Sequence, residues 1–244
     1  MEINLIKRDI VTLFLMHYNI GMGRPTDTND IRTYCLNHIG GVFDTNYLSK
    51  HLFDAVPVAN FRKYVTRFEK EGLLRKISKG LFMIGDSELD DEERITRHYL
   101  SDGLCTSGLV GGADLLNELG LSMIKGKTII YSNKAVGIKH LNELNIDIIE
   151  SHANYGFPFG GRDINIVLEL LNCRNYIIVD EELDYHNKIR ELLAKYNDDQ
   201  LTSFVDFNLY PRHIFLSLAN LLESMHISNK VMEIYAHKIR NSIS

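Results

Sequence analysis

Seven cationic side chains are concentrated in one short stretch of a chain that is acidic overall. Residues 61–80 contain seven lysines and arginines and two glutamates, whereas all 244 residues together have a formal net charge of −5. Lysine and arginine bind anions, and a local cationic cluster is typical of a segment that contacts phosphate groups. The candidate binding residues of this stretch are Arg62, Lys63, Thr66, Arg67, Lys70, Arg75, Lys76 and Lys79.

The apolar residues between these cations predict a helix that orients them. Pro57 suits the first turn of a helix, and Gly72 suits the position just after its end. In between, apolar residues recur at the helical spacing i, i+3, i+4 and i+7, at Phe61, Tyr64, Val65 and Phe68. Burial of this stripe turns the opposite face to solvent. That face is centred on Ala59, Lys63, Thr66 and Lys70, with Arg62 and Arg67 beside it.

The neighbouring segments predict two earlier helices and a β-hairpin. Residues 28–41 have a cap-like start and a closing glycine pair, and residues 44–52 predict a second, short helix with its own cap. After the third helix, residues 73–77 and 81–84 are typical of strands. We expect a three-residue turn between them that ends in Gly80, because a hairpin turn needs a residue with positive φ.

Three helices followed by a hairpin is the element order of a winged helix-turn-helix domain, and the positive charge fits duplex DNA. The third helix would enter the major groove with its polar face toward bases and phosphates. The hairpin cations would lie on the flanking phosphate backbone. The alternative is that these lysines only keep a surface soluble. The coincidence of the charge with this element order favours DNA.

An acidic run from Gly85 to Arg94 predicts a boundary between two domains. It contains no large apolar run and lies between a predicted strand and a predicted helix. Residues 1–85 carry 12 basic and 8 acidic side chains, and the rest of the chain carries 15 and 24. We therefore expect a cationic winged-helix domain over residues 1–88, with an extra N-terminal helix, and an acidic domain over residues 89–244.

The second part of the chain mixes strand-like and helix-like segments. Runs of β-branched residues at 127–133 and 146–151 predict strands, with a third candidate between them. Helices are predicted over residues 112–119, from residue 162 or 163 onward, over residues 181–197 and from residue 211 onward. The expected fold class is therefore α+β: an N-terminal winged helix-turn-helix domain plus a C-terminal mixed α/β domain with a small sheet and several helices.

Patterns typical of enzyme active sites are missing from the sequence. Its glycine-rich segments match neither a phosphate loop nor the GxGxxG spacing, its histidines do not have metal-binding spacing, and it has no GxSxG elbow. We therefore expect a protein that is not an enzyme and has no metal or cofactor. The enzyme alternative is a nuclease, whose metal site needs carboxylates and a lysine from adjacent strands. The candidates are Asp147, Glu150 and Asp163 with Lys127 or Lys139.

The N-terminal apolar run is too short to cross a membrane. It extends over seven residues, Ile10–Met16, and no cleavage site typical of a signal peptide follows it. We expect a helix over residues 2–18 and no membrane contact. The three cysteines are far apart in the sequence, which favours reduced thiols in a cytoplasmic protein.

The order of these motifs resembles the antitoxins of the AbiEi type, from type IV toxin–antitoxin and phage abortive-infection systems. The resemblance covers roughly residues 29–226. In the winged helix it rests on Gly72, Leu74, Arg75, Gly80, Leu81 and Phe82. In the second domain it rests on Gly112, Ala113, Leu119, Gly120, Leu121 and Ile129 to Ser132, and on the stretch "PRHIFLSLANLLESMHI". The extra N-terminal helix and the aromatic core of the third helix depart from the family pattern.

The resemblance implies a bacterial cytoplasmic protein with two roles in phage defence. Its winged helix would bind inverted repeats in the promoter of its own operon and act as a transcriptional repressor. Its second domain would counteract a toxin that resembles a nucleotidyltransferase, without itself being an enzyme. One alternative is a stand-alone winged-helix regulator whose second domain senses a ligand or dimerises. The other is the DNA-targeted nuclease.

Overall fold

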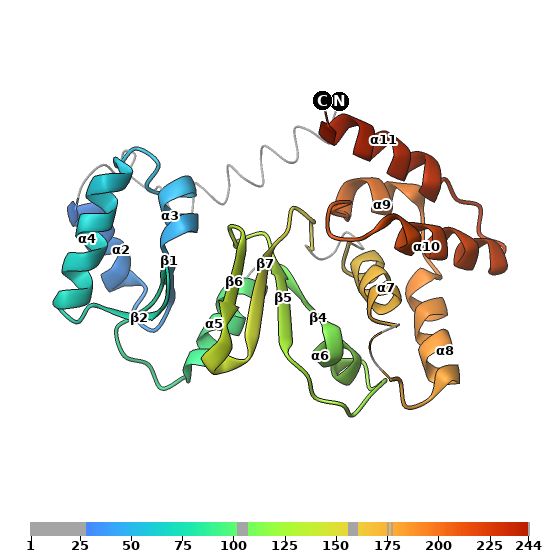
Figure 1. Ribbon diagram of the computed structural model, residues 1–244, viewed down its shortest axis with the longest axis horizontal. Coiled ribbons are helices and arrows are strands. Elements are labelled where there is room, and N and C mark those ends of the chain that lie inside the picture. The colour runs from blue at the N-terminus through green and yellow to red at the C-terminus, as the bar shows by residue number, and fades with distance from the viewer. Residues whose placement is uncertain (1–27, 102–106, 156–160, 175, 177, 244) are drawn as a thin grey trace. The chain divides into compact units, whose positions relative to one another are not determined.

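The chain divides into two compact units, Met1–Glu88 and Leu89–Ser244 (Figure 1). The computed structural model describes residues 28–101, 107–155, 161–174, 176 and 178–243, so the helix expected over residues 2–18 lies outside the described residues. Helices and two small sheets confirm the α+β fold class. Within the described ranges, no helix has both the length and the apolar character needed to cross a membrane.

The first unit has the winged helix-turn-helix arrangement (Figure 1). Its three strands form one antiparallel sheet in the order β1-β3-β2. The ring of Phe61 packs against the rings of Phe43 and Phe53 at centroid distances of 6.0 and 5.8 Å, so aromatic side chains form part of the core. The elements are α2 (Thr28–Asn37), β1 (Val42–Asp44), α3 (Thr45–His51), α4 (Val58–Lys70), β2 (Leu74–Ser78) and β3 (Leu81–Ile84).

Two details of the sequence prediction for this unit were wrong. The prediction lacked β1, whose three residues pair with β3 through Phe43 and Phe82. The predicted three-residue turn is a two-residue turn, because Ser78 belongs to β2 and pairs with Leu81. A register irregularity between Lys76 and Ser78 absorbs the extra residue.

The end of α4 is fixed by a hydrogen-bonded glycine cap. The amide of Leu73 donates to the carbonyl of Phe68 at 2.9 Å, and the amide of Gly72 donates to the carbonyl of Glu69 at 3.1 Å. These two bonds form a Schellman motif, which needs a left-handed residue at its centre. Gly72 fills this position with φ +76°. The motif stops the helix at a defined residue and leads the chain directly into β2.

We expect Gly72→Ala to lower the free energy of unfolding of the first unit by about 1 kcal/mol, because alanine is strained in the left-handed region. The added Cβ would meet nothing within 4 Å, so the backbone alone sets this cost. Urea unfolding followed by circular dichroism measures it. Gly72→Asn is the control and should recover part of the loss, because asparagine adopts this conformation more readily. Equal losses in both variants would contradict the backbone explanation.

The second unit is built on a four-stranded mixed sheet in the order β4-β5-β7-β6. Strands β5 and β7 are parallel, and the other pairs are antiparallel. Its elements are α5 (Asp91–Leu100), β4 (Gly108–Gly111), α6 (Gly112–Glu118), β5 (Thr128–Ser132), β6 (Ile138–Leu141), the 3-10 turn η1 (Asn142–Leu144), β7 (Ile146–Glu150), α7 (Gly161–Cys173), α8 (Glu182–Leu193), α9 (Asp198–Phe204), α10 (Arg212–Ser224) and α11 (Val231–Ile243).

Helices cover both faces of this sheet. Ser132 donates its hydroxyl to the carbonyl of Tyr99 at the end of α5, and its neighbour Tyr131 hydrogen-bonds to Glu169 of α7. Because successive residues of a strand point to opposite faces, α5 and α7 lie on opposite sides of β5. Helices α7 to α11 pack against one another, with α7 in contact with α8, α9 and α10 (Figure 1). The larger apolar core includes residues of the sheet and of these helices.

The sequence predicted the long helices and the β-branched strands of this unit and missed other elements. Strands β5, β6 and β7 and helices α5, α6, α7 and α10 lie where they were expected. The prediction lacked β4, α9 and α11, and α8 ends at Leu193 rather than near Asn197. A separate helix, α9, begins at Asp198, because Asn197 caps its first turn through a hydrogen bond to the amide of Gln200.

Candidate nucleic-acid interface

The exposed face of α4 is a row of polar side chains held by a buried apolar stripe. Phe61, Val65 and Phe68 are at most 6% exposed and pack into the core of the first unit. Their burial fixes the rotation of the helix, so that the opposite face points to solvent. The residues of that face are all exposed: Ala59, Lys63, Thr66 and Lys70.

Two lysines of this row keep their charge available for a ligand. Among the residues that the structure describes, no ion pair includes Lys63 or Lys70. Arg62 is likewise exposed at one side of the row. Exposed cations on one helix face create a positive potential that attracts a polyanion.

Arg67, by contrast, is engaged by its own helix. Its Nε lies 3.6 Å from Glu71 Oε1, and its guanidinium lies 5.3 Å from the centroid of the Phe68 ring. Glu71 also forms an ion pair with Arg32 of α2, and the Arg32 guanidinium lies 4.9 Å from the same ring. The two arginines therefore share Glu71 and Phe68 at the end of α4. The Glu71 carboxylate therefore offsets part of the positive charge that Arg67 presents to another anion.

Thr66 also has a partner within the helix. Its hydroxyl donates to the carbonyl of Arg62 at 3.0 Å. This bond commits the hydroxyl proton to the helix backbone. What remains for a ligand is the γ-methyl group and an acceptor lone pair of the oxygen.

The structure separates the cations of the hairpin. Lys76 pairs with Phe82, which belongs to the core of the unit, so Lys76 lies on the sheet face that carries the helices. Arg75 pairs with Met83 and lies on the opposite face. Arg75 and Lys76 thus do not form the single hairpin surface that the sequence predicted.

Lys79 lies in the short turn of the hairpin, next to the start of α3. The carbonyl of Gly80 accepts hydrogen bonds from the amide and the hydroxyl of Thr45, at 2.9 and 3.0 Å. The last residue of β1, Asp44, pairs with the first residue of β3, Leu81. Only the turn of the hairpin therefore extends beyond β1. The wing is therefore short and is held against the helix-turn-helix.

The carboxylates proposed for a nuclease do not meet in the second unit. Lys127 Nζ and His140 Nδ1 each lie 2.7 Å from Asp147 Oδ1. Burial alone would raise the pKa of Asp147, but the hydrogen bonds from Lys127 and His140 lower it overall. Glu150 is three residues further along β7 and points to the other face of the sheet. Asp163 is exposed on α7, and no described group of three His, Cys, Asp or Glu residues could hold a metal ion.

Lys139, the other lysine of that set, is separated from Asp147 as well. It pairs with Ile148 on β7, whereas His140 pairs with Asp147. Lys139 therefore belongs to the sheet face opposite Asp147. The strand register rules out a shared site for these two residues.

A buried carboxylate that the sequence analysis missed lies in the core of the second unit. Glu169 is 1% exposed, and its Oε1 accepts hydrogen bonds from the Gly112 amide and the Cys173 thiol, both at 3.0 Å. The N-cap of α6, Gly111, has no side chain, so Glu169 caps this helix from a distance. A Cβ at Gly111 would lie 2.8 Å from Glu169 Oε1, which explains the glycine. The sequence holds no local signal for this contact, because Gly112 and Glu169 are 57 residues apart.

The electrostatics of this buried acid favour its neutral form. Burial raises the pKa of Glu169, although hydrogen bonds from Cys173 and Gly112 act in the opposite direction. Its second oxygen, Oε2, and the hydroxyl of Tyr210 are buried and have no hydrogen-bond partner at normal geometry among the described residues. Burial, followed by the charge of Glu169, raises the pKa of Tyr210. Both side chains are buried, at 1% and 3% exposure.

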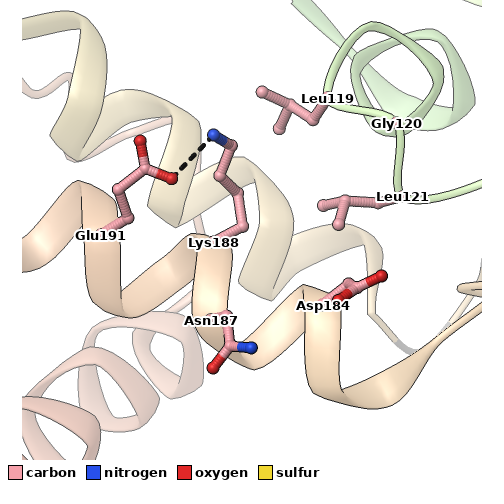
Figure 2. Close-up of a pocket in the computed structure, with 7 residues that line it drawn as sticks. All are labelled: Leu119, Gly120, Leu121, Asp184, Asn187, Lys188 and Glu191. Carbon is pink, nitrogen blue, oxygen red and sulfur yellow. Dashed lines mark hydrogen bonds and ion pairs between the residues drawn. The ribbon is translucent and has the colours of Figure 1, made fainter.

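The described residues of the second unit line at least two surface pockets. One, of about 270 Å³, lies between the end of α6 and α8, and Figure 2 shows its Lys188–Glu191 ion pair of 2.9 Å opposite Leu119 and Leu121. The ion pair offsets the charge of the lysine, and Asp184 and Asn187 are the other polar side chains that line this pocket. The other, of about 410 Å³, is mainly apolar and is lined by Gly112, Ala113, Ile124, Gly126, Lys127, Ile129, Tyr176 and Ile178.

Comparison with known proteins adds no family to this description. A scan against protein-family models finds no match, and a search of curated proteins finds no significant similarity.

Proposed function

We propose that this protein binds duplex DNA through α4 of its winged helix and is an antitoxin that represses its own operon. The observation that carries the DNA part is the exposed row of α4, in which Lys63 and Lys70 stand without an ion-pair partner among the described residues. An α-helix fits the major groove, and cations on its outer face release counterions from phosphates. Lys76 is a further exposed cation of this unit, on the sheet face that carries the helices.

The antitoxin part rests on the resemblance of the motifs to the AbiEi type. In this proposal the second unit counteracts a nucleotidyltransferase-like toxin and performs no catalysis of its own. Its acidic composition keeps this unit off DNA by charge repulsion. The pairing of Asp147 with Lys127 and His140 supports a structural role for that carboxylate, in place of a role in a nuclease.

The test of DNA binding is selection from a library of random duplexes with the full chain. We expect an enriched inverted repeat that also occurs upstream of the gene. If the selection at 0.1 M salt enriches no sequence, the DNA part of the proposal is overturned. For the antitoxin part, the chain is co-expressed with the nucleotidyltransferase-like protein encoded beside it. Growth should be restored, and continued toxicity would overturn that part.

We expect Glu71→Gln to tighten DNA binding by about two- to threefold, because it frees Arg67 and removes a negative charge at the end of α4. Fluorescence anisotropy with the selected duplex measures the change. Glu88→Gln, an exposed glutamate of the same unit, is the charge-matched control and should change affinity less. Weaker binding of the Glu71 variant would show that Glu71 positions Arg67 and Arg32 for the complex.

The apolar pocket of the second unit favours one other function, a ligand-controlled transcriptional regulator. Its volume of about 410 Å³ falls within the usual range for small-molecule sites. The site is open to solvent, because its lining residues Ile124, Tyr176 and Ile178 are exposed. This function predicts that a small apolar molecule changes the affinity for the selected duplex. An affinity that no compound of a diverse small-molecule library alters would leave the antitoxin as the better proposal.

A further inference from the structure

We infer that α4 reads thymines through the methyl groups of Ala59 and Thr66, on either side of a guanine bound by Lys63. The inference rests on the proposed DNA binding and names the bases that the site recognises. It uses one row of the helix surface, in which an apolar group, a cation and a second apolar group follow one another.

The spacing of this row matches the spacing of base pairs. Ala59, Lys63 and Thr66 stand at i, i+4 and i+7 and are all exposed. Seven residues of helix rise about 10 Å, which corresponds to roughly three base-pair steps of about 3.4 Å. Lys70 lies about 6 Å further along the helix and is placed to meet a phosphate. The row therefore presents three groups to about three or four consecutive base pairs.

The chemistry of each group selects a base. In the major groove, thymine carries a methyl group, and guanine presents two acceptors, N7 and O6. Lys63 has only donors, so it fits guanine. Ala59 has only a methyl group. Thr66 donates its hydroxyl to the carbonyl of Arg62 at 3.0 Å, which leaves its γ-methyl as the apolar group of the row.

The test uses the duplex recovered from the random library and replaces each thymine in turn with deoxyuridine, which lacks only the methyl group. We expect two thymines, one on each side of a guanine, to be sensitive. Loss of each methyl contact should weaken binding by about fourfold, the equivalent of one buried carbon. Uniform insensitivity at all thymines, in a chain that binds the duplex tightly, would overturn the inference and leave the proposed function intact.

Variants of Thr66 separate its methyl group from its hydroxyl. Thr66→Val keeps a methyl group and should retain the preference for thymine over uracil at one position. Thr66→Ser keeps the hydroxyl and should lose that preference. Ala59→Gly should lose the preference at the other position, with circular dichroism as the check on folding. A Val variant that loses the preference while the Ser variant keeps it would show that the oxygen reads the base. An empty library selection would instead remove the proposed function itself.

Discussion

Replacement of Lys63 and Lys70 together with alanine is expected to weaken binding to the selected duplex by at least about tenfold at 0.15 M salt. Both side chains are exposed on the outer face of α4, and the described residues provide no ion pair that competes for them. A plot of log affinity against log salt should also become shallower, by about one unit for each lysine that meets a phosphate. Fluorescence anisotropy between 0.05 and about 0.2 M salt measures both quantities.

The matched control for this variant removes two positive charges from the second unit. Lys125 and Lys195 are exposed there, and their double replacement with alanine changes the net charge by the same amount. We expect that control to bind nearly as the natural chain does. If the two double variants weaken binding equally, net charge alone explains the effect. Unchanged binding of the Lys63 and Lys70 variant would remove α4 from the proposed interface.

The sequence was sufficient to predict α4 because every signal for this helix is local. Phe61, Val65 and Phe68 follow the helical period, and their burial determines which side chains face solvent. The stop signal, Gly72, is equally local, because its positive φ depends only on the turn that it forms. A helix with a clear stripe and a clear cap can therefore be oriented without knowledge of its partners.

The strands and the hairpin cations depended on distant parts of the chain. Strand β1 has only three residues, and it exists because β3 pairs with it. Strand β4 is glycine-rich, which lowers its strand propensity, and it is stabilised by pairing with β5. The register of β2 against β3 determines which face of the sheet carries Arg75 and which carries Lys76. Periodicity within a segment contains no information about such pairing.

The buried acid in the second unit had the weakest sequence signal of all. Glu169 stands in α7 between Leu168 and Leu170, as an exposed glutamate of an amphipathic helix also would. Its partner amide, Gly112, is 57 residues earlier in the chain. Only the folded structure shows that this carboxyl takes the place of a helix cap on α6.

Glu169→Gln is expected to raise the free energy of unfolding at neutral pH and to remove part of its pH dependence. Burial raises the pKa of Glu169 in the folded state above its ordinary value of 4.5. Below pH 4.5 both states hold the proton, so the contribution of Glu169 to stability is fully present. As pH rises further, only the unfolded state releases its proton at first, and stability falls until the folded-state pKa is passed. Glutamine cannot ionise and escapes this loss.

The glutamine variant also preserves the geometry of the buried site. Its amide oxygen can accept from the Gly112 amide as Oε1 does. Its NH₂ group takes the place of Oε2, which has no hydrogen-bond partner among the described residues, so these buried N–H groups offset part of the gain. Glu169→Leu keeps the bulk but leaves the Gly112 amide without an acceptor, which should cost about 1–3 kcal/mol at every pH. The two variants therefore separate the effect of charge from the effect of the lost hydrogen bond.

Urea unfolding between pH 4 and about 9 measures the free energy of unfolding of each variant. Backbone amide exchange in α6 is the local readout. Glu143→Gln, an exposed glutamate of the same unit, is the control and should follow the natural chain across the series. Parallel stability curves for the natural chain and Glu169→Gln would mean that the folded-state pKa is not raised. A glutamine variant that is less stable throughout would show that the ionised carboxylate, through its hydrogen bond to Gly112, is the form that the fold requires. The expected divergence of the two curves as pH rises, with glutamine the more stable on the alkaline side, would establish that folding raises the pKa of Glu169.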